Sequence, residues 1–117
     1  MKAKVIINRK EFIAELYDNE SARAFFSMLP LSFEMEEMNG NEKCRYLSKK
    51  LPVNSEKIEE INAGDIMLLG PSCLTVFYRS SSTGKSYTKL GRITDTEGLA
   101  EAAGKWDAEI TFEAINE

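Results

Sequence analysis

Two segments of the chain place aromatic and cationic side chains where neighbouring strands would bring them together. The first contains Phe77 and Tyr78, and the second contains Tyr87 and Arg92. If Phe77 and Tyr87 lie on facing strands, they offer apolar area beside a guanidinium group, a combination typical of sites for a small ligand or a peptide. Ordinary cross-strand pairing beside a surface arginine is the alternative interpretation.

Composition excludes most familiar catalytic and metal-binding arrangements. The chain contains no histidine, which removes imidazole ligands and the Ser-His-Asp and Cys-His nucleophile systems. Its two cysteines, Cys44 and Cys73, are 29 positions apart and form no zinc motif. Residues 34–42 are acidic but lack the spacing of a calcium loop, so a solvent-exposed edge is favoured. Hydrolysis by paired carboxylates stays open, but we assign no catalytic residue and expect no metal and no cofactor.

One further motif resembles a phosphate-binding loop. Residues 82–86 read Ser-Thr-Gly-Lys-Ser. A P-loop needs a glycine five residues before its Gly-Lys step and a helix after it, so that backbone N–H groups surround the phosphates. Position 79 is Arg79 and a strand is expected to follow, so we predict no nucleotide site here.

Length and composition predict one domain over residues 1–117. Hydrophobic residues make up 43% of the chain and charged residues 29%, which is ordinary globular composition. The formal net charge of −4, without a basic stripe, argues against nucleic acid as a partner. No segment approaches the ~20 apolar residues of a membrane helix, and the N-terminal apolar run is too short for a signal peptide. We therefore expect a cytoplasmic protein whose two thiols are unpaired; its oligomeric state is not indicated.

Alternation of apolar and polar residues predicts a chain rich in strands. A hairpin is expected first, with strands at about 2–8 and 11–17 and a two-residue turn at Asn8-Arg9. The later strands are expected at 31–36, 43–47, 66–69, 74–78, 87–93 and 108–114. The runs at 66–69 and 74–78 are apolar on both faces and should lie at the centre of the sheet. Gly91, inside a strand, indicates a bulge or a tight barrel bend.

The segments between these strands carry weaker patterns. Residues 48–62 are predicted to form a surface loop, and residues 80–85 a polar turn. A helix is expected where apolar residues recur at helical spacing from Ala22 to Leu29, with Asp18 or Asn19 as its N-cap and Pro30 after its end.

A second helix is expected near the C-terminus. Thr94 to Glu97 has the form of a capping box, Leu99, Ala102 and Ala103 would form the buried stripe, and Gly104 would close the helix. Short helices that interrupt many strands are typical of a closed antiparallel β-barrel whose ends the helices cover.

The ordered set of motifs resembles a known family. Its pieces are Leu16-Tyr17-Asp18-Asn19, Leu29-Pro30-Leu31, Asn39 to Lys43, Leu51-Pro52, Ala63 to Ile66, Phe77-Tyr78 and Ser86 to Ile93. Together they cover nearly the whole chain and resemble the small bacterial cyclophilin-like proteins. The resemblance implies a mainly β fold, a closed antiparallel cyclophilin-like barrel of about eight strands capped by two short helices.

The resemblance does not extend to the prolyl isomerase motifs of true cyclophilins. The strand expected to carry the isomerase arginine reads Leu31-Ser32-Phe33-Glu34-Met35, and the groove histidine is absent from the chain. Because that arginine polarises the prolyl amide, its loss removes the main electrostatic contribution. We expect a domain that binds a small molecule or a peptide without isomerase activity. A weak isomerase or another small-molecule enzyme, and a protein-interaction module, are the alternatives.

The cyclophilin arrangement also implies where a ligand would bind. Strands 73–78 and 87–93 would flank the groove, and because Phe77 and Tyr78 point to opposite faces of one strand, only one can line it. The resemblance favours Phe77, which leaves Tyr78 for the core. The turn with Glu42 and Arg45 would close one side. The predicted ligand-binding residues are Phe77, Tyr87, Arg92, Glu42 and Arg45.

Overall fold

The N-terminal residues form the predicted hairpin. In the computed structural model, which describes residues 1–116, β1 (Lys2–Ile7) pairs with β2 (Lys10–Leu16) through a turn at Asn8 and Arg9. Both turn residues have positive φ angles, 46° and 76°. Positive φ at both positions characterises the type I′ turn, whose twist matches that of the flanking strands.

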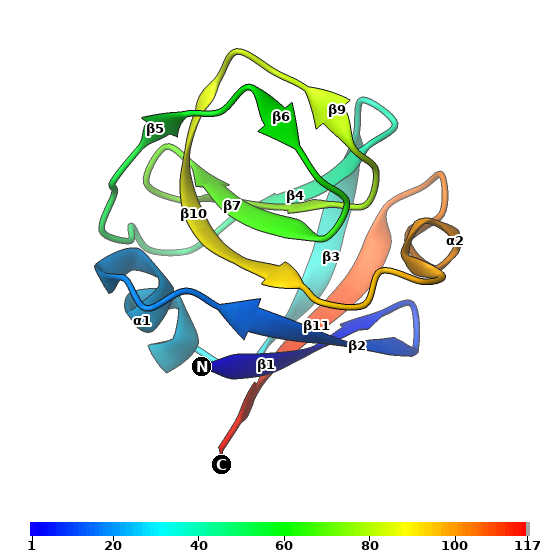
Figure 1. The fold of residues 1–117 in the computed structure, drawn as a ribbon. Helices are drawn as coiled ribbons and strands as arrows, with labels where there is room; N and C mark the ends of the chain where they lie inside the picture. The colour runs from blue at the N-terminus through cyan, green and yellow to red at the C-terminus, as the bar shows by residue number, and fades with distance from the viewer. Residues whose placement is uncertain (117) are drawn as a thin grey trace.

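Eight strands close into an antiparallel barrel (Figure 1). Their order around the barrel is β2, β1, β11, β3, β4, β8, β7 and β10, and β10 returns to β2 through Gly91, Arg92 and Ile93. The bounds of the other strands are β3 (Leu31–Met38), β4 (Glu42–Tyr46), β7 (Asp65–Leu69), β8 (Cys73–Phe77), β10 (Ser86–Ile93) and β11 (Ala108–Ile115). The predicted fold class is confirmed. Strands β7 and β8 are largely buried and paired on both sides, as expected, but in a closed barrel no strand is central.

The bulge predicted at Gly91 lies where the barrel closes. The register of β10 against β7 shifts between Lys89 and Gly91. A Cβ atom on Gly91 would lie 2.5 Å from the backbone oxygen of Glu15 and 2.8 Å from a methyl carbon of Leu16. Glycine is therefore required here because the backbones of β2 and β10 approach too closely for any side chain.

Helix α1 (Glu20–Ser27) follows the hairpin as predicted. The side chain of Asn19 accepts a hydrogen bond from the backbone N–H of Ala22 at 2.7 Å, so Asn19, rather than Asp18, is the N-cap. The ring of Phe25 meets Phe112 edge to face, with 5.5 Å between centroids. This contact fixes α1 against the barrel.

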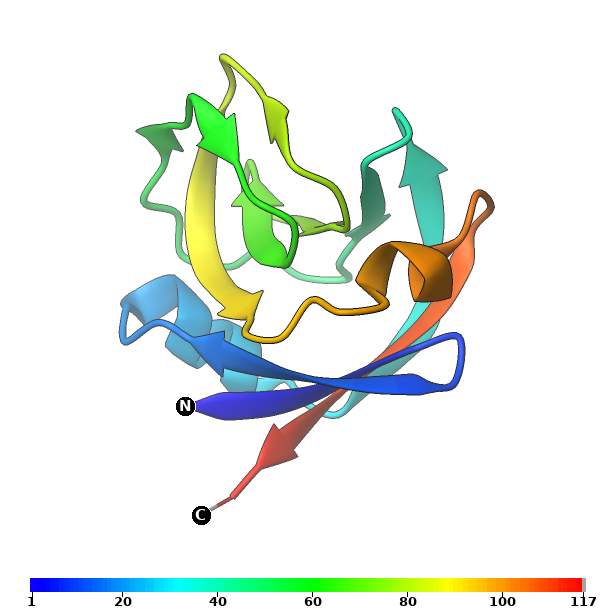
Figure 2. The ribbon, with the colours of Figure 1, turned by 45° about the vertical axis from the view of Figure 1, so that its right-hand side comes forward.

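Helix α2 (Leu99–Ala103) corrects one prediction. The capping box at 94–97 does not form, because Gly98, with a φ of 77°, is the N-cap and no side chain caps the helix. The Asp95 carboxylate instead accepts a hydrogen bond from the N–H of Glu97 and makes a turn before the helix. Gly104 ends the helix with a φ of 66°, as predicted. The two helices lie on opposite sides of the barrel in Figure 2.

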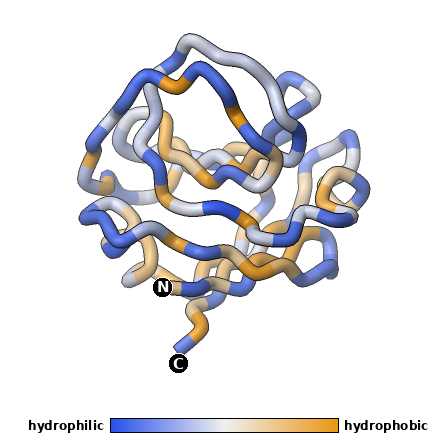
Figure 3. Tube along the Cα trace, viewed as in Figure 1, coloured by the Kyte–Doolittle hydropathy of each residue, from blue (hydrophilic) through white to orange (hydrophobic). Residues whose placement is uncertain are grey.

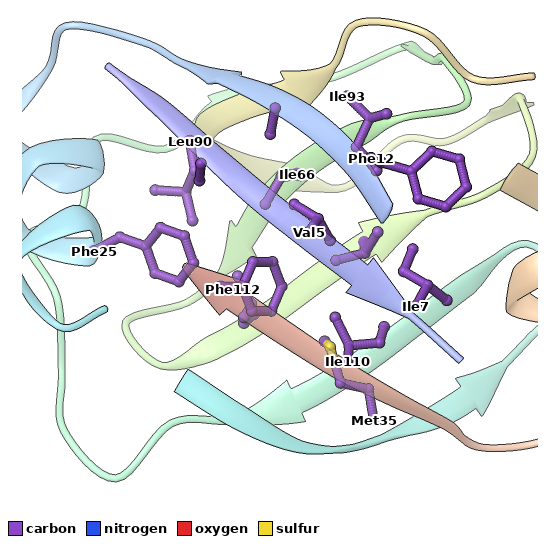
Figure 4. Packing of buried hydrophobic residues seen from close by; sticks show 14 of the residues in the cluster. Val5, Ile7, Phe12, Phe25, Met35, Ile66, Leu90, Ile93, Ile110 and Phe112 are labelled. Carbon is purple, nitrogen blue, oxygen red and sulfur yellow. The ribbon is translucent and has the colours of Figure 1, made fainter. Parts of the chain in front are cut away.

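The barrel interior is filled by apolar side chains from both helices and from every barrel strand except β4, whose buried side chain is that of Lys43 (Figure 4). Val5, Ile66 and Phe112 are fully buried there. Alternation decides this arrangement, because every second residue of each strand points inward.

The segment at 48–62 is not a plain surface loop. It contains β5 (Glu56–Lys57), which pairs with β10, and β6 (Glu60–Ile61), which pairs with β9 (Ser81–Ser82). We call residues 53–63 the arm; Figure 1 shows it beside β10, and Figure 3 shows that it is mostly hydrophilic. Two-residue strands are too short to produce alternation, so the sequence pattern gave no sign of them. The strand β9 likewise interrupts the predicted polar turn at 80–85.

Candidate functional site

The arm encloses a groove against the outer side of the barrel. This arm groove has a volume of about 780 Å³, within the range of roughly 300–1,000 Å³ that small ligands occupy. Its lining comes from the arm, from β7 and β10, and from residues next to β2 and β10: Tyr17, Glu56, Lys57, Ile58, Glu59, Glu60, Asn62, Ala63, Asp65, Met67, Lys89, Gly91, Arg92, Ile93, Thr94 and Thr96.

The charged side chains of the arm groove differ in whether they have an ion-pair or hydrogen-bond partner. Lys89 forms an ion pair with Glu56 of the arm at 3.2 Å. The Asp65 carboxylate accepts a hydrogen bond from the N–H of Asn62 at 2.8 Å. Arg92 is exposed, and within residues 1–116 its guanidinium has neither an ion pair nor a hydrogen bond. The groove therefore presents an unused planar donor, which suits a carboxylate or another oxygen acceptor on a ligand.

Phe77 and Tyr87 contact each other, but under the arm rather than in the open. Their ring centroids are 5.7 Å apart with an interplanar angle of 85°, an edge-to-face pair. Only 0% and 2% of their surfaces are exposed, because Ile58 and Ile61 of the arm pack over them. A ligand would reach these rings only if the arm moved. Tyr78 points into the barrel core, as strand parity predicts.

Glu42 lies beside this aromatic pair. It is directly opposite Phe77 in the β4–β8 register. Burial raises the pKa of Glu42; Lys85 opposes that shift, and Glu37 adds to it. Burial also raises the pKa of Tyr87, and the Glu42 charge raises it further. The structure thus groups Glu42, Phe77 and Tyr87, while Arg92 lies in the arm groove.

Arg45 lies apart from the other predicted residues. Its guanidinium is 5.0 Å from the centroid of the Phe33 ring, and it donates to the backbone oxygen of Glu34 at 3.2 Å. Glu34 belongs to the part of β3 that pairs only with β11, since β4 pairs with β3 at residues 36–38. Arg45 therefore covers an open strand edge, a common protection against unwanted strand pairing.

A buried ionic cluster at one end of the barrel was not predicted from the sequence. Lys43 is 1% exposed, and its Nζ donates to Glu37 Oε1 at 3.0 Å and to the backbone oxygens of Gly104 at 2.9 Å and Trp106 at 2.6 Å. The Tyr78 hydroxyl donates to the same Glu37 oxygen at 2.6 Å. One signal was present in the sequence. Alternation along the strand directs Lys43 inward, because its neighbours Glu42 and Cys44 face outward.

The pKa shifts of Glu37 and Tyr78 indicate that the Lys43 cluster stabilises the fold. Burial alone would raise the pKa of Glu37, but hydrogen bonds from Tyr78, Lys43 and the Gly40 N–H outweigh burial and lower it. Burial, aided by the hydrogen bond to Glu37, raises the pKa of Tyr78 to about 12. These donors and acceptors bond to one another, so the cluster ties the loop after α2 to β3 and β4.

The remaining reactive groups are the two cysteines, both of them free. Within residues 1–116, no group of three or more histidine, cysteine, aspartate or glutamate side chains is arranged to hold a metal ion. In the same part of the chain, neither helix is long and apolar enough to cross a membrane.

Comparison with known proteins gives one match. The sequence model of the cyclophilin-like family matches residues 5–113. No curated protein and no solved structure matches the chain. The matched range runs from within β1 to within β11, so it contains the arm groove and the Lys43 cluster.

Proposed function

The chain belongs to the cyclophilin-like family, and from this premise we propose that it is a binding domain for a small molecule or a short peptide, without prolyl isomerase activity. The unpartnered guanidinium of Arg92 in the arm groove is the observation that carries the proposal. Met67 also lines the groove, although only 2% of its surface is exposed, so the groove offers a cationic donor beside a small apolar area.

The lack of isomerase activity is inferred from the residues that the reaction would need. The stretch of β3 where the resemblance expects an arginine reads Leu31 to Met35, and the chain has no histidine. Phe77, which resembles a groove phenylalanine of the isomerases, is covered by the arm. Without an arginine to polarise the prolyl amide, little stabilisation of the twisted transition state is left. Free thiols at Cys44 and Cys73 also suit our expectation of a reducing, cytoplasmic location.

A thermal-shift screen of metabolites and short peptides tests the proposal. We expect at least one compound to stabilise the wild-type protein and to bind Arg92→Ala about tenfold or more weakly, since a hydrogen bond to a charged group contributes roughly 1.5–3 kcal/mol. The matched control is Arg23→Ala, an arginine outside the groove that is 54% exposed and paired with Asp18. Tyr87→Phe, which removes only a hydroxyl under the arm and keeps the ring contact with Phe77, measures whether that hydroxyl contributes to binding.

The variants separate the possible results. Loss of affinity in Arg92→Ala but not in Arg23→Ala supports the arm groove. Equal stabilisation of all variants by the compound would place the site elsewhere on the barrel. Absence of any hit would contradict the proposal and favour a protein-interaction module.

A further inference from the structure

Cys44 and Cys73 occupy adjacent strands on the outer face of the barrel. In the β4–β8 register Cys44 is opposite Thr75, and Tyr46 is opposite Cys73. The two cysteines are therefore diagonal neighbours on one face, because they are offset by two positions along the strands. Each thiol is near enough to influence the pKa of the other.

The two thiols differ in their access to solvent. Cys44 is partly exposed, whereas Cys73 is buried, with 6% of its surface exposed. A small reagent in solution would therefore meet Cys44 first, and Cys73 carries the other thiol of the pair. The sequence contains no third cysteine, so no other thiol of the chain competes for either partner.

We propose that this pair is a redox modification site, at which a small-molecule disulfide such as glutathione disulfide converts the two thiols into a Cys44–Cys73 bond. The Cys44 thiolate attacks one glutathione sulfur, breaks the glutathione S–S bond and releases one glutathione thiol. The Cys73 thiolate then attacks the Cys44 sulfur of the mixed disulfide and releases the second glutathione. Both protons leave with the two glutathione thiols, and the protein is oxidised by two electrons as glutathione disulfide is reduced.

The surroundings indicate a slow and reversible reaction. Burial raises the pKa of both thiols, that of Cys44 to about 11, so few thiolates are present near neutral pH. Diagonal neighbours in a sheet have Cα atoms about 7–8 Å apart, slightly more than the roughly 4.4–6.8 Å of most disulfides. The strands must therefore approach each other, and the strained bond is readily reduced.

The bond would have a structural consequence for the arm. Residues 45–72, which the bond would close into a loop, include the whole arm, one wall of the arm groove. Cross-linking the ends of this segment would limit how far the arm can detach from β7 and β10. The modification site thus couples the oxidation state to a surface that the proposed function uses, although its chemistry does not depend on that function.

The test is intact mass analysis of the folded wild-type protein after incubation with glutathione disulfide and alkylation under denaturing conditions. We expect loss of both alkylatable thiols, a mass lower by two hydrogen atoms, a linked peptide joining Cys44 to Cys73, and recovery of both thiols in excess reduced glutathione. In Cys73→Ser, we expect the reaction to stop at the glutathione adduct on Cys44.

Three results would overturn the proposal. They are retention of both free thiols in the folded wild-type protein, a stable glutathione adduct on wild-type Cys44, and a disulfide that forms only between two molecules. Each is read from the wild-type protein, so none depends on whether a variant folds. A failure here would leave the ligand screen on Arg92→Ala unaffected.

Discussion

Lys43 is the residue on which one end of the barrel most depends. Its ammonium group is fully enclosed and bonded to Glu37 and to two backbone oxygens. Lys43→Met keeps the length of the side chain but leaves the partly buried Glu37 carboxylate, whose side chain is 19% exposed, beside an uncharged group. We expect a loss of about 3–5 kcal/mol in the free energy of unfolding, because removing one partner of a buried ion pair leaves the other charge uncompensated.

Urea denaturation of Lys43→Met and a matched lysine variant measures this effect. Lys89→Met removes the pair with Glu56, whose two side chains are 48% and 55% exposed. Exposed pairs contribute roughly 0–1 kcal/mol, so this control should lose little. Similar losses in the two variants would contradict the role assigned to Lys43.

Tyr78 predicts how stability changes in alkaline solution. Its pKa is raised from 10.0 to about 12 in the folded protein, by burial first and then by the hydrogen bond to Glu37. The unfolded chain therefore loses this proton at lower pH than the folded chain. The stabilising contribution is complete below pH 10 and is lost as the pH rises toward 12.

Chemical denaturation across this alkaline range provides the measurement. The free energy of unfolding should fall less steeply with pH in Tyr78→Phe than in the wild type. Tyr46→Phe, at a tyrosine that is 74% exposed, should keep the wild-type slope. A Tyr78→Phe slope equal to that of the wild type would show that this hydroxyl does not carry the linkage.

At the residue scale, the sequence predicted which side chains meet better than it predicted which of them are exposed to solvent. The inward direction of Tyr78 follows from strand alternation, a strictly local property. Phe77 and Tyr87 do meet, but the expectation that their strands are neighbours is wrong, because β7 lies between β8 and β10. The burial of Phe77 depends on Ile58 and Ile61, which lie in a segment without a recognisable period. The Lys43 cluster was missed for a related reason, since two of the three acceptors of Lys43 are backbone oxygens of a loop more than sixty residues away.

At the scale of elements, the short pairing of β2 with β10 is the seam that closes the barrel. Gly91→Ala would place a methyl group 2.5 Å from the backbone oxygen of Glu15, so the two strands must separate. We expect a destabilisation of about 1–3 kcal/mol or more. Gly84→Ala, where an added Cβ has no atom within 4 Å, should change stability by no more than about 0.5 kcal/mol.

Thermal unfolding of both glycine variants tests this seam. Amide hydrogen exchange in Gly91→Ala should quicken first at residues 14–16 and 91–93, where the two strands pair. Unchanged stability would mean that the seam accommodates a side chain and that closure does not depend on the glycine.

The elements were predictable wherever one pattern spans several residues. Strands of five residues or more showed alternation or a continuous apolar run, and α1 showed helical spacing. The arm was not predictable, because β5, β6 and β9 have two residues each. The capping box failed for a different reason: Asp95 satisfies the N–H of Glu97 in a turn, and the helix begins only after Gly98.

At the scale of the whole molecule, having the family fold does not imply having prolyl isomerase activity. We expect proline isomerisation to be absent or very weak, because no arginine or histidine stands where the isomerase reaction needs them. A protease-coupled assay on a proline peptide, with an authentic cyclophilin as the positive control, measures this. A rate constant within about tenfold of the authentic enzyme would contradict the expectation, since a tenfold difference corresponds to only ~1.4 kcal/mol in the barrier.

Mapping a bound ligand by amide NMR spectroscopy tests the central claim most directly. Isotope-labelled protein would be titrated with a compound from the thermal-shift screen, and the same titration repeated with Arg92→Ala. The account predicts shifted amide signals confined to the arm and to residues 89, 91–94 and 96, which line the groove, and much smaller shifts in the variant. Shifts centred on the open edge of β3 near Arg45, unchanged by Arg92→Ala, would contradict it.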